Sequence, residues 1–164
     1  MRLTLTRSLS FQLAVLCLTA AWCVSANAQS PLVQIIPEPK KITMGEGSFT
    51  IDRNTRVILA ESNSAEDRFA AEDFIDDLKA TAGVGISIGK GSARREITIG
   101  RIDLPTIAQL LKRSNTEVPA TLTDEGYILV TTNDRVIVAG KSVTGTFYGI
   151  QTLKQLVRGE AANA

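Results

Sequence analysis

The sequence predicts an α+β domain of two layers, in which two helices pack on one face of a mostly antiparallel or mixed sheet. Three observations support this class. Many short stretches alternate between apolar and polar residues, which is the period of a β-strand. Only two long stretches carry apolar residues at helical spacing, and turns rich in glycine or proline separate the elements.

The first strands of the predicted sheet come from four short apolar stretches. They are Val33–Ile36, Lys41–Met44, Ser48–Ile51 and Arg56–Ala60. Pro37 and Pro39 end the first stretch, because proline cannot donate a hydrogen bond to a strand ladder. A turn with glycines at 45 and 47 separates the second stretch from the third. We therefore expect four strands before the first helix.

A long amphipathic helix is predicted over residues 64–82. Ser64 is a suitable N-cap, and Glu66 and Asp67 provide the acidic first turn that a helix N-terminus favours. Gly83 is a natural C-terminal stop. The apolar stripe of this helix consists of Ala70, Ala71, Phe74, Ile75 and Leu78.

The remaining strands and the second helix follow this first helix. The predicted strands are Ile86–Ile88, Ile97–Ile99, Tyr127–Thr131 and Arg135–Ala139, of which the last two form a hairpin. The second helix is predicted over Thr146–Val157, with Ile150 and Leu153 on its apolar face.

The segment 101–120 leaves two alternatives open. Ile107, Leu110 and Leu111 favour a short helical turn. Pro105 and Pro119 bound this stretch, so that a loop is a fair alternative.

The N-terminus has the pattern of a secretory signal peptide. Arg2 and Arg7 give a positive start, and the stretch Phe11–Val24 is almost wholly apolar but shorter than the roughly 20 residues that span a bilayer. Small residues at Ala26 and Ala28 place cleavage before Gln29. We thus expect a signal peptide over 1–28, a single domain over 29–164, and an exported protein that is periplasmic or secreted.

Composition argues against several kinds of site in residues 29–164. The sequence has no His, and Cys17 and Cys23 both lie in the predicted signal peptide. Zinc sites and nucleophiles activated by histidine therefore lack their usual side chains. We predict no catalytic residue, no metal site and no cofactor site. Without Arg2 and Arg7 the formal charge is slightly negative, so we expect no nucleic-acid partner and no membrane contact after cleavage.

Two motifs superficially suggest chemistry. The adjacent acids Asp124 and Glu125 could act on a sugar as paired carboxylates do in glycosidases. They open the predicted hairpin, however, and a solvated turn explains them without catalysis. The glycine-rich stretch Gly83–Ser92 suggests a phosphate loop, but Val84 and Gly91 occupy positions where such a loop needs glycine and Ser or Thr. We interpret both motifs as turns.

Aromatic residues are few. Phe69, Phe74 and Phe147 fall on or near apolar helix stripes, so we expect all three in the core. Tyr127 and Tyr148 could present hydroxyl groups, but two tyrosines do not define a sugar site.

Several segments resemble one known domain in the same order. Ile36–Pro39 followed by Gly47–Ile51 resembles its opening, and Glu125–Leu129 followed by Val136–Gly140 resembles its central hairpin. Gly145–Leu156 resembles its closing helix and is the most specific match. Together they resemble the N-terminal, non-catalytic domain of β-N-acetylhexosaminidases in glycoside hydrolase family 20. Similar accessory domains precede the barrels of O-GlcNAc hydrolases and α-glucuronidases.

The resemblance implies a role but no catalytic residue. Enzymes of the family remove terminal N-acetylhexosamine residues, and their acid pair lies in a (β/α)₈ barrel that follows this domain. Asp124 and Glu125 belong to the hairpin motif instead. We therefore expect an inactive accessory domain whose partner is a catalytic barrel in a longer or separate chain. The alternative is a freestanding exported module that binds carbohydrate or another partner.

Overall fold

The computed structural model describes residues 35–157 except Ser92. The predicted signal peptide, residues 1–28, lies outside the described residues, and so does Val33 of the first predicted strand.

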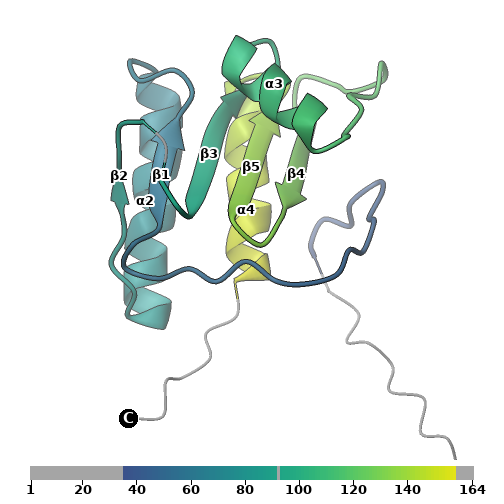
Figure 1. Ribbon diagram of the computed structural model, residues 1–164. Coiled ribbons are helices and arrows are strands. Elements are labelled where there is room, and N and C mark those ends of the chain that lie inside the picture. Colours follow the sequence, from purple (N-terminus) through teal and green to yellow (C-terminus); the bar gives the residue numbers. More distant parts are fainter. Residues whose placement is uncertain (1–34, 92, 158–164) are drawn as a thin grey trace, which may run out of the picture. The chain divides into compact units, whose positions relative to one another are not determined.

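The described residues form one mixed sheet of five strands in the order β2-β1-β3-β5-β4 (Figure 1). The strands are β1 (Arg56–Leu59), β2 (Ser87–Ile88), β3 (Glu96–Arg101), β4 (Tyr127–Thr131) and β5 (Arg135–Gly140). β1 pairs in parallel with β2 and β3, and β3 pairs in parallel with β5. Among the described strands, only β4 and β5 pair antiparallel, as the predicted hairpin. The mixed sheet of the predicted fold class is confirmed.

Two helices, α2 (Ala65–Ala82) and α4 (Val143–Leu156), cover one face of this sheet, behind the strands in Figure 1. The main core lies between them and the strands. Its strand residues are Val57, Leu59, Ile97, Ile99, Val136 and Val138, and its helix residues include Ala70, Ala71, Phe74, Leu78, Ile150 and Leu153. The α+β class with two helices packed on one face is thereby confirmed.

The two helices begin and end at capping residues. The Ser64 hydroxyl oxygen accepts a hydrogen bond from the backbone N–H of Asp67 at 3.1 Å, and Gly83 adopts the left-handed conformation with φ +67°. Both predicted caps of α2 are confirmed. α4 begins three residues before the predicted Thr146, because the Ser142 hydroxyl accepts from the backbone N–H groups of Thr144 and Gly145.

A third helix, α3 (Pro105–Arg113), packs on the opposite face of the sheet. Its buried residues Ile107, Leu110 and Leu111 contact a second apolar cluster that includes Ile137 and Ala139 of β5. Proline at the first helical position is compatible with the helix, since that N–H has no partner in any case. Of the two alternatives for 101–120, the helical one therefore holds over 105–113. No helix within the described part of the chain is long and apolar enough to cross a membrane.

The three strands predicted before Arg56 are absent from the described residues. Residues 35–51, called the strap below, contain no strand at Ile35–Ile36, Lys41–Met44 or Ser48–Ile51. Phe49 and Ile51 are partly buried against the main core, whereas Ile42 and Met44 are exposed. The alternation of apolar residues is genuine, but a strand needs a partner backbone, and the strap pairs with none of the described strands.

Candidate docking surface

The acid pair Asp124–Glu125 lies in an exposed turn before β4. The backbone oxygen of Asp124 accepts a hydrogen bond from the Ser142 hydroxyl at 2.7 Å, and the Gly126 N–H donates to the Thr123 oxygen at 2.8 Å. The turn thus supports the N-cap of α4. Over residues 35–157 without Ser92, no group of three or more His, Cys, Asp or Glu residues could hold a metal ion. That the chain lacks catalytic, metal and cofactor residues stays a prediction.

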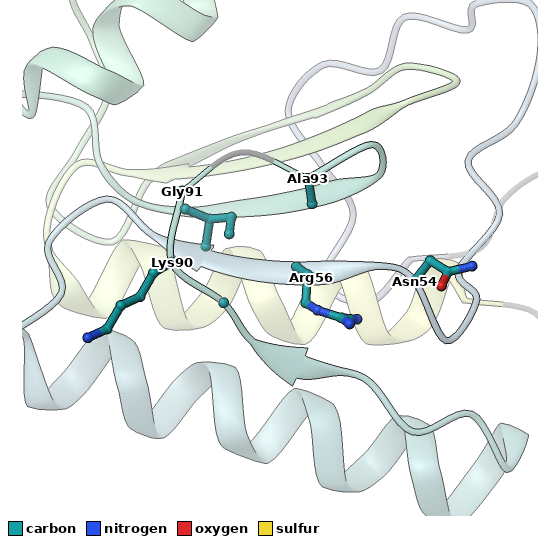
Figure 2. Close-up of a pocket in the computed structure, with 7 residues that line it drawn as sticks. Asn54, Arg56, Lys90, Gly91 and Ala93 are labelled. Atoms are coloured by element: carbon teal, nitrogen blue, oxygen red, sulfur yellow. The ribbon is translucent and has the colours of Figure 1, made fainter.

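Gly89, Lys90 and Gly91 of the glycine-rich stretch follow β2, in the connection to β3, and form one wall of a shallow pocket of about 350 Å³. Arg56 and Lys90 both line it, but Figure 2 shows their side chains extending away from each other. The Arg56 guanidinium donates to the backbone oxygens of Arg53 and Thr55, at 2.8 and 2.9 Å. The two cations therefore do not converge on one point, as an anion site would need.

A charged cluster lies where β1 and β3 end. The Arg101 guanidinium contacts Glu61 at 2.8 Å and Asp103 at 3.6 Å. Asp67, in the first turn of α2, is buried, and its carboxylate accepts no hydrogen bond from the described residues. Burial raises the pKa of Asp67 above its ordinary value, although Ser64 and Arg101 act in the opposite direction. The ion pair between Arg101 and Glu61 joins the β1–α2 loop to β3, and the Arg101 guanidinium is paired within this cluster.

The outer side of the helix layer, which faces away from the sheet, carries exposed aromatic residues. Phe69 of α2 is 64% exposed and Tyr148 of α4 is 42% exposed. Phe147 is partly buried against the main core, with its ring centroid 6.1 Å from that of Tyr148. We call Phe69, Phe147 and Tyr148 the aromatic patch. Among the three phenylalanines predicted in the core, Phe74 is buried, Phe147 is packed at its edge, and the prediction for Phe69 is wrong.

Helical spacing explains the position of Phe69. Successive residues of a helix are about 100° apart, so the side chain of Phe69 points about 100° away from that of Ala70. Phe69 also lies five positions before Phe74, which places these two side chains about 140° apart around the helix. The stripe formed by Ala70, Phe74 and Leu78 is the one that faces the sheet. The helical spacing therefore indicated that Phe69 faces outward, whereas the prediction of burial rested on the size and apolar character of its side chain.

A polar network on the outer side fixes α2 against α4. The Asp73 carboxylate accepts a hydrogen bond from Lys154 at 2.6 Å and from Gln151 at 3.2 Å. The bond from Lys154 lowers the pKa of Asp73 below its ordinary value. Both helices follow mutually parallel strands and pack on the same face, so they run in the same direction.

This network fixes how far α2 is shifted along α4, and with it the relative heights of the aromatic residues on the two helices. Phe69 lies one turn before Asp73 on α2, and Phe147 lies one turn before Gln151 on α4. Phe69 of α2 and Phe147 of α4 therefore stand at about the same height along the two helices. Tyr127, in contrast, uses its hydroxyl internally, at 2.6 Å from the Thr152 hydroxyl.

The outer side of the helix layer can bind another surface better than it can perform chemistry. It combines exposed aromatic rings with polar groups that already hydrogen-bond to one another, which is the composition of many protein interfaces. A rigid pair of helices also presents these side chains in a fixed arrangement. We regard this surface as the candidate functional site.

Comparison with known sequences finds a matching family model and a related protein. The model of the family described as glycosyl hydrolase family 20, domain 2, matches residues 32–164. The beta-hexosaminidase of Porphyromonas gingivalis (strain ATCC BAA-308 / W83) is 30% identical over 168 residues, which cover 96% of this chain and 19% of the relative. The chain therefore spans about a fifth of the length of that curated relative.

Solved structures contain the same fold. The GH20 β-N-acetylhexosaminidase from Streptomyces coelicolor A3(2) matches 79% of this chain and 22% of its own, with a TM-score of 0.57 and 25% identity. The protein CpGH84D matches 77% of this chain and 22% of its own, with a TM-score of 0.64 and 16% identity. The second match shows the fold alone. In both proteins, the matched fold occupies about a fifth of the chain.

Proposed function

The chain belongs to the family of glycosyl hydrolase family 20, domain 2, and on this premise we propose that it is the accessory domain of a β-N-acetylhexosaminidase. In this proposal the domain docks, through the outer side of α2 and α4, onto a catalytic (β/α)₈ barrel in a longer or separate chain. The parent enzyme removes terminal N-acetylhexosamine residues, and the domain itself contributes no catalytic residue.

The observation that carries the proposal is the exposed aromatic patch on an otherwise well packed helix layer. The residues facing the sheet already provide a continuous core, so Phe69 and Tyr148 are not needed to close it. Their exposure leaves apolar area that burial against a partner would remove from water, at about 25 cal/mol per Å². The relative from P. gingivalis, four-fifths of which lies outside the match, has room for such a partner.

A hybrid enzyme tests the docking. This chain replaces the matching segment of the P. gingivalis beta-hexosaminidase, and the half-life of its activity on an aryl N-acetyl-β-glucosaminide is measured at raised temperature. We expect a longer half-life than for the same enzyme with the segment deleted. In the hybrid, the double variant Phe69→Ala/Tyr148→Ala should remove most of this gain.

Val118→Ala is the matched control for this experiment. Val118 is 43% exposed, a fraction similar to the 42% of Tyr148. It follows α3 in the chain, however, and lies away from the two helices of the candidate surface. Its substitution should leave the half-life unchanged. A hybrid no longer-lived than the deletion, or a control as damaging as the double variant, would show that the helix layer does not dock.

The purified chain alone should not hydrolyse the same substrate, beside a full-length family enzyme as the positive control. Turnover that survives repurification would contradict the proposal. In that event, Asp124 and Glu125 would be the first residues to mutate, since adjacent carboxylates are the groups that glycosidase chemistry uses.

A glycan-binding module is the second candidate, and the exposure of Phe69 and Tyr148 is the observation that favours it, because sugar rings stack on aromatic side chains. A pull-down of the purified chain on chitin beads separates the two candidates. Retention that Phe69→Ala/Tyr148→Ala abolishes would favour the glycan module. The accessory-domain proposal expects the chain to stay in the unbound fraction.

We also propose that the protein is exported, to the periplasm or outside the cell. The N-terminal pattern of Arg2, Arg7 and the apolar stretch Phe11–Val24 supports this. Intact-mass measurement of the protein from its native source should give a chain that begins at Gln29. A mass that includes residues 1–28 would contradict cleavage.

A further inference from the structure

β4 forms one edge of the sheet, at the right of Figure 1. Two backbone hydrogen bonds show which of its residues face β5. The Thr132 N–H donates to the Arg135 oxygen at 2.8 Å, and the Lys141 N–H donates to the Gly126 oxygen at 2.8 Å. These bonds lie just beyond the two ends of β4, so the even-numbered residues of the strand direct their backbone groups to β5.

The odd-numbered residues of β4 face away from the sheet. They are Tyr127, Leu129 and Thr131, and the N–H and C=O groups of each point outward, because successive residues of an antiparallel strand direct these groups to opposite sides. No described residue hydrogen-bonds to these outward groups. A second extended strand supplies acceptors and donors at the same spacing, so the chemistry of this edge selects a β-strand as its partner.

β4 lacks the features by which proteins usually block an edge strand. Its five residues include no proline and no charged side chain, and its register with β5 has no bulge. Leu129 packs against the main core, while Ile128 and Val130 pack against the second cluster, so both faces of the strand are held. The opposite edge of the sheet, β2, has only two residues and is protected by its shortness.

We propose that the edge of β4 binds β4 of a second copy of this chain. The two strands run antiparallel around a two-fold axis at Leu129, so that Leu129 lies opposite Leu129 of the second copy and Tyr127 lies opposite its Thr131. In this register each of the facing residue pairs exchanges two hydrogen bonds, and every outward group of both strands is used. On the other face of the sheet Ile128 lies opposite Val130 of the second copy, so the opposing side chains carry no charge.

The choice of a second copy follows from which strands of the chain can pair. Among the described strands, β4 alone has an open edge longer than two residues. The strap reaches the end of the hairpin instead, because a Cβ atom added to Gly47 would contact Asn133 in the β4–β5 turn. Pairing of β4 with itself also uses the open edge of both copies, so the assembly closes as a dimer. This surface lies at the side of the sheet and goes beyond the docking proposed for the helix layer.

The dimer should be weak and should depend on concentration. Five residues from each copy are far fewer than the roughly 20–30 residues a side of a stable interface. Sedimentation equilibrium of the purified chain should therefore give the mass of a monomer at about 10 μM, and a weight-average mass approaching twice that value at about 1 mM.

Backbone amide hydrogen exchange locates the pairing. The outward N–H groups of Tyr127, Leu129 and Thr131 become hydrogen-bonded in the dimer, so their exchange should slow about threefold or more between the lower and the higher concentration. The amides of Ile128 and Val130 already bond to β5 and should slow less.

Thr131→Pro removes one outward N–H without removing a bond to β5, since Thr131 faces away from that strand. This variant should stay monomeric at the higher concentration. Thr131→Ala is the matched control, because it removes the same exposed side chain but keeps the N–H, and it should dimerise nearly as the wild type does. If Thr131→Pro strongly lowers the urea midpoint of the chain, the exchange of the wild type decides the question by itself.

Three outcomes would overturn the inference. The first is a chain that stays monomeric at the higher concentration, with unprotected amides at Tyr127, Leu129 and Thr131. The second is protection of these amides that is equal at both concentrations, which would assign the edge to another segment of the same chain. The third is a dimer that survives Thr131→Pro but is lost in Phe69→Ala/Tyr148→Ala, which would place the contact on the helix layer.

Discussion

The two sides of the helix layer use the same residue types for different purposes. Phe74 and Phe69 lie five positions apart on α2, yet Phe74 is 1% exposed and packs against the sheet, whereas Phe69 is 64% exposed. The inner side is apolar, and its contacts are repeated along every central strand. The outer side combines aromatic rings with the Asp73–Lys154 ion pair and with the hydrogen bonds between Gln155 and Ile36.

This difference separates what stabilises the domain from what the domain can offer to a partner. Substitutions on the inner side should lower the free energy of unfolding of the chain itself. Substitutions on the outer side should leave that free energy nearly unchanged and act only when a partner is bound. Four predictions test the distinction, from the largest expected effect to the smallest.

Phe74→Ala should have the largest effect. Phe74 is buried in the main core, so its truncation removes apolar contacts and leaves a cavity, and the free energy of unfolding should fall by about 3–5 kcal/mol. Urea denaturation of the purified chain measures this loss. An unchanged denaturation midpoint would mean that α2 does not pack on the sheet through this residue.

Gly149→Ala should destabilise the inner side by overpacking. A Cβ atom at Gly149 would lie 2.6 Å from Val138 Cγ1, closer than unstrained atoms approach, and 3.3 Å from the ring of Tyr127, which is a tight contact. We expect a loss of about 1–3 kcal/mol in the same denaturation experiment. Gly85→Ala is the control, because no atom lies within 4 Å of its added Cβ. Equal stability of Gly149→Ala and wild type would contradict the close approach of α4 to β4 and β5.

Asp67→Asn should change how stability depends on pH. Burial raises the pKa of Asp67 in the folded chain above the value of about 3.9 for an exposed carboxyl. The folded state therefore binds this proton more tightly than the unfolded state does. Its contribution to stability is complete below the unfolded pKa and is lost as pH rises through the folded pKa.

The asparagine variant lacks this titration, so the stability of the wild type relative to the variant should fall as pH rises from about 3 towards neutral. Comparison of the two chains at each pH cancels the titration of groups such as Asp73, whose pKa is lowered. A difference that is constant over this range would show that Asp67 titrates normally.

Phe69→Ala should have the smallest effect on the chain alone. Its side chain is mostly exposed, and surface substitutions of this kind change the free energy of unfolding by about 0.5 kcal/mol or less. The same urea experiment measures it beside Phe74→Ala, as a matched pair on one helix. A loss of several kcal/mol would mean that the outer side belongs to the core and is not free to dock.

Local signals in the sequence are sufficient for most of the regular structure. Ser64 and Gly83 mark the two ends of α2, and the alternation around the turn at 132–134 marks the β4–β5 hairpin. The segments that resemble the family, above all Gly145–Leu156, identify the domain type from residue identities alone. Each of these features depends on neighbours close along the chain, so the sequence by itself determines it.

Only the tertiary structure decided where the remaining residues stand. The strap has the alternation of a strand, but no strand among the described residues offers it a partner, and residue types cannot reveal that. Helical spacing allowed Phe69 to face outward, yet only the packed sheet shows which side of α2 is inner. The hydrogen bonds between Gln155 and Ile36 join residues 119 positions apart, and such pairings exist only once the fold has brought the two segments together.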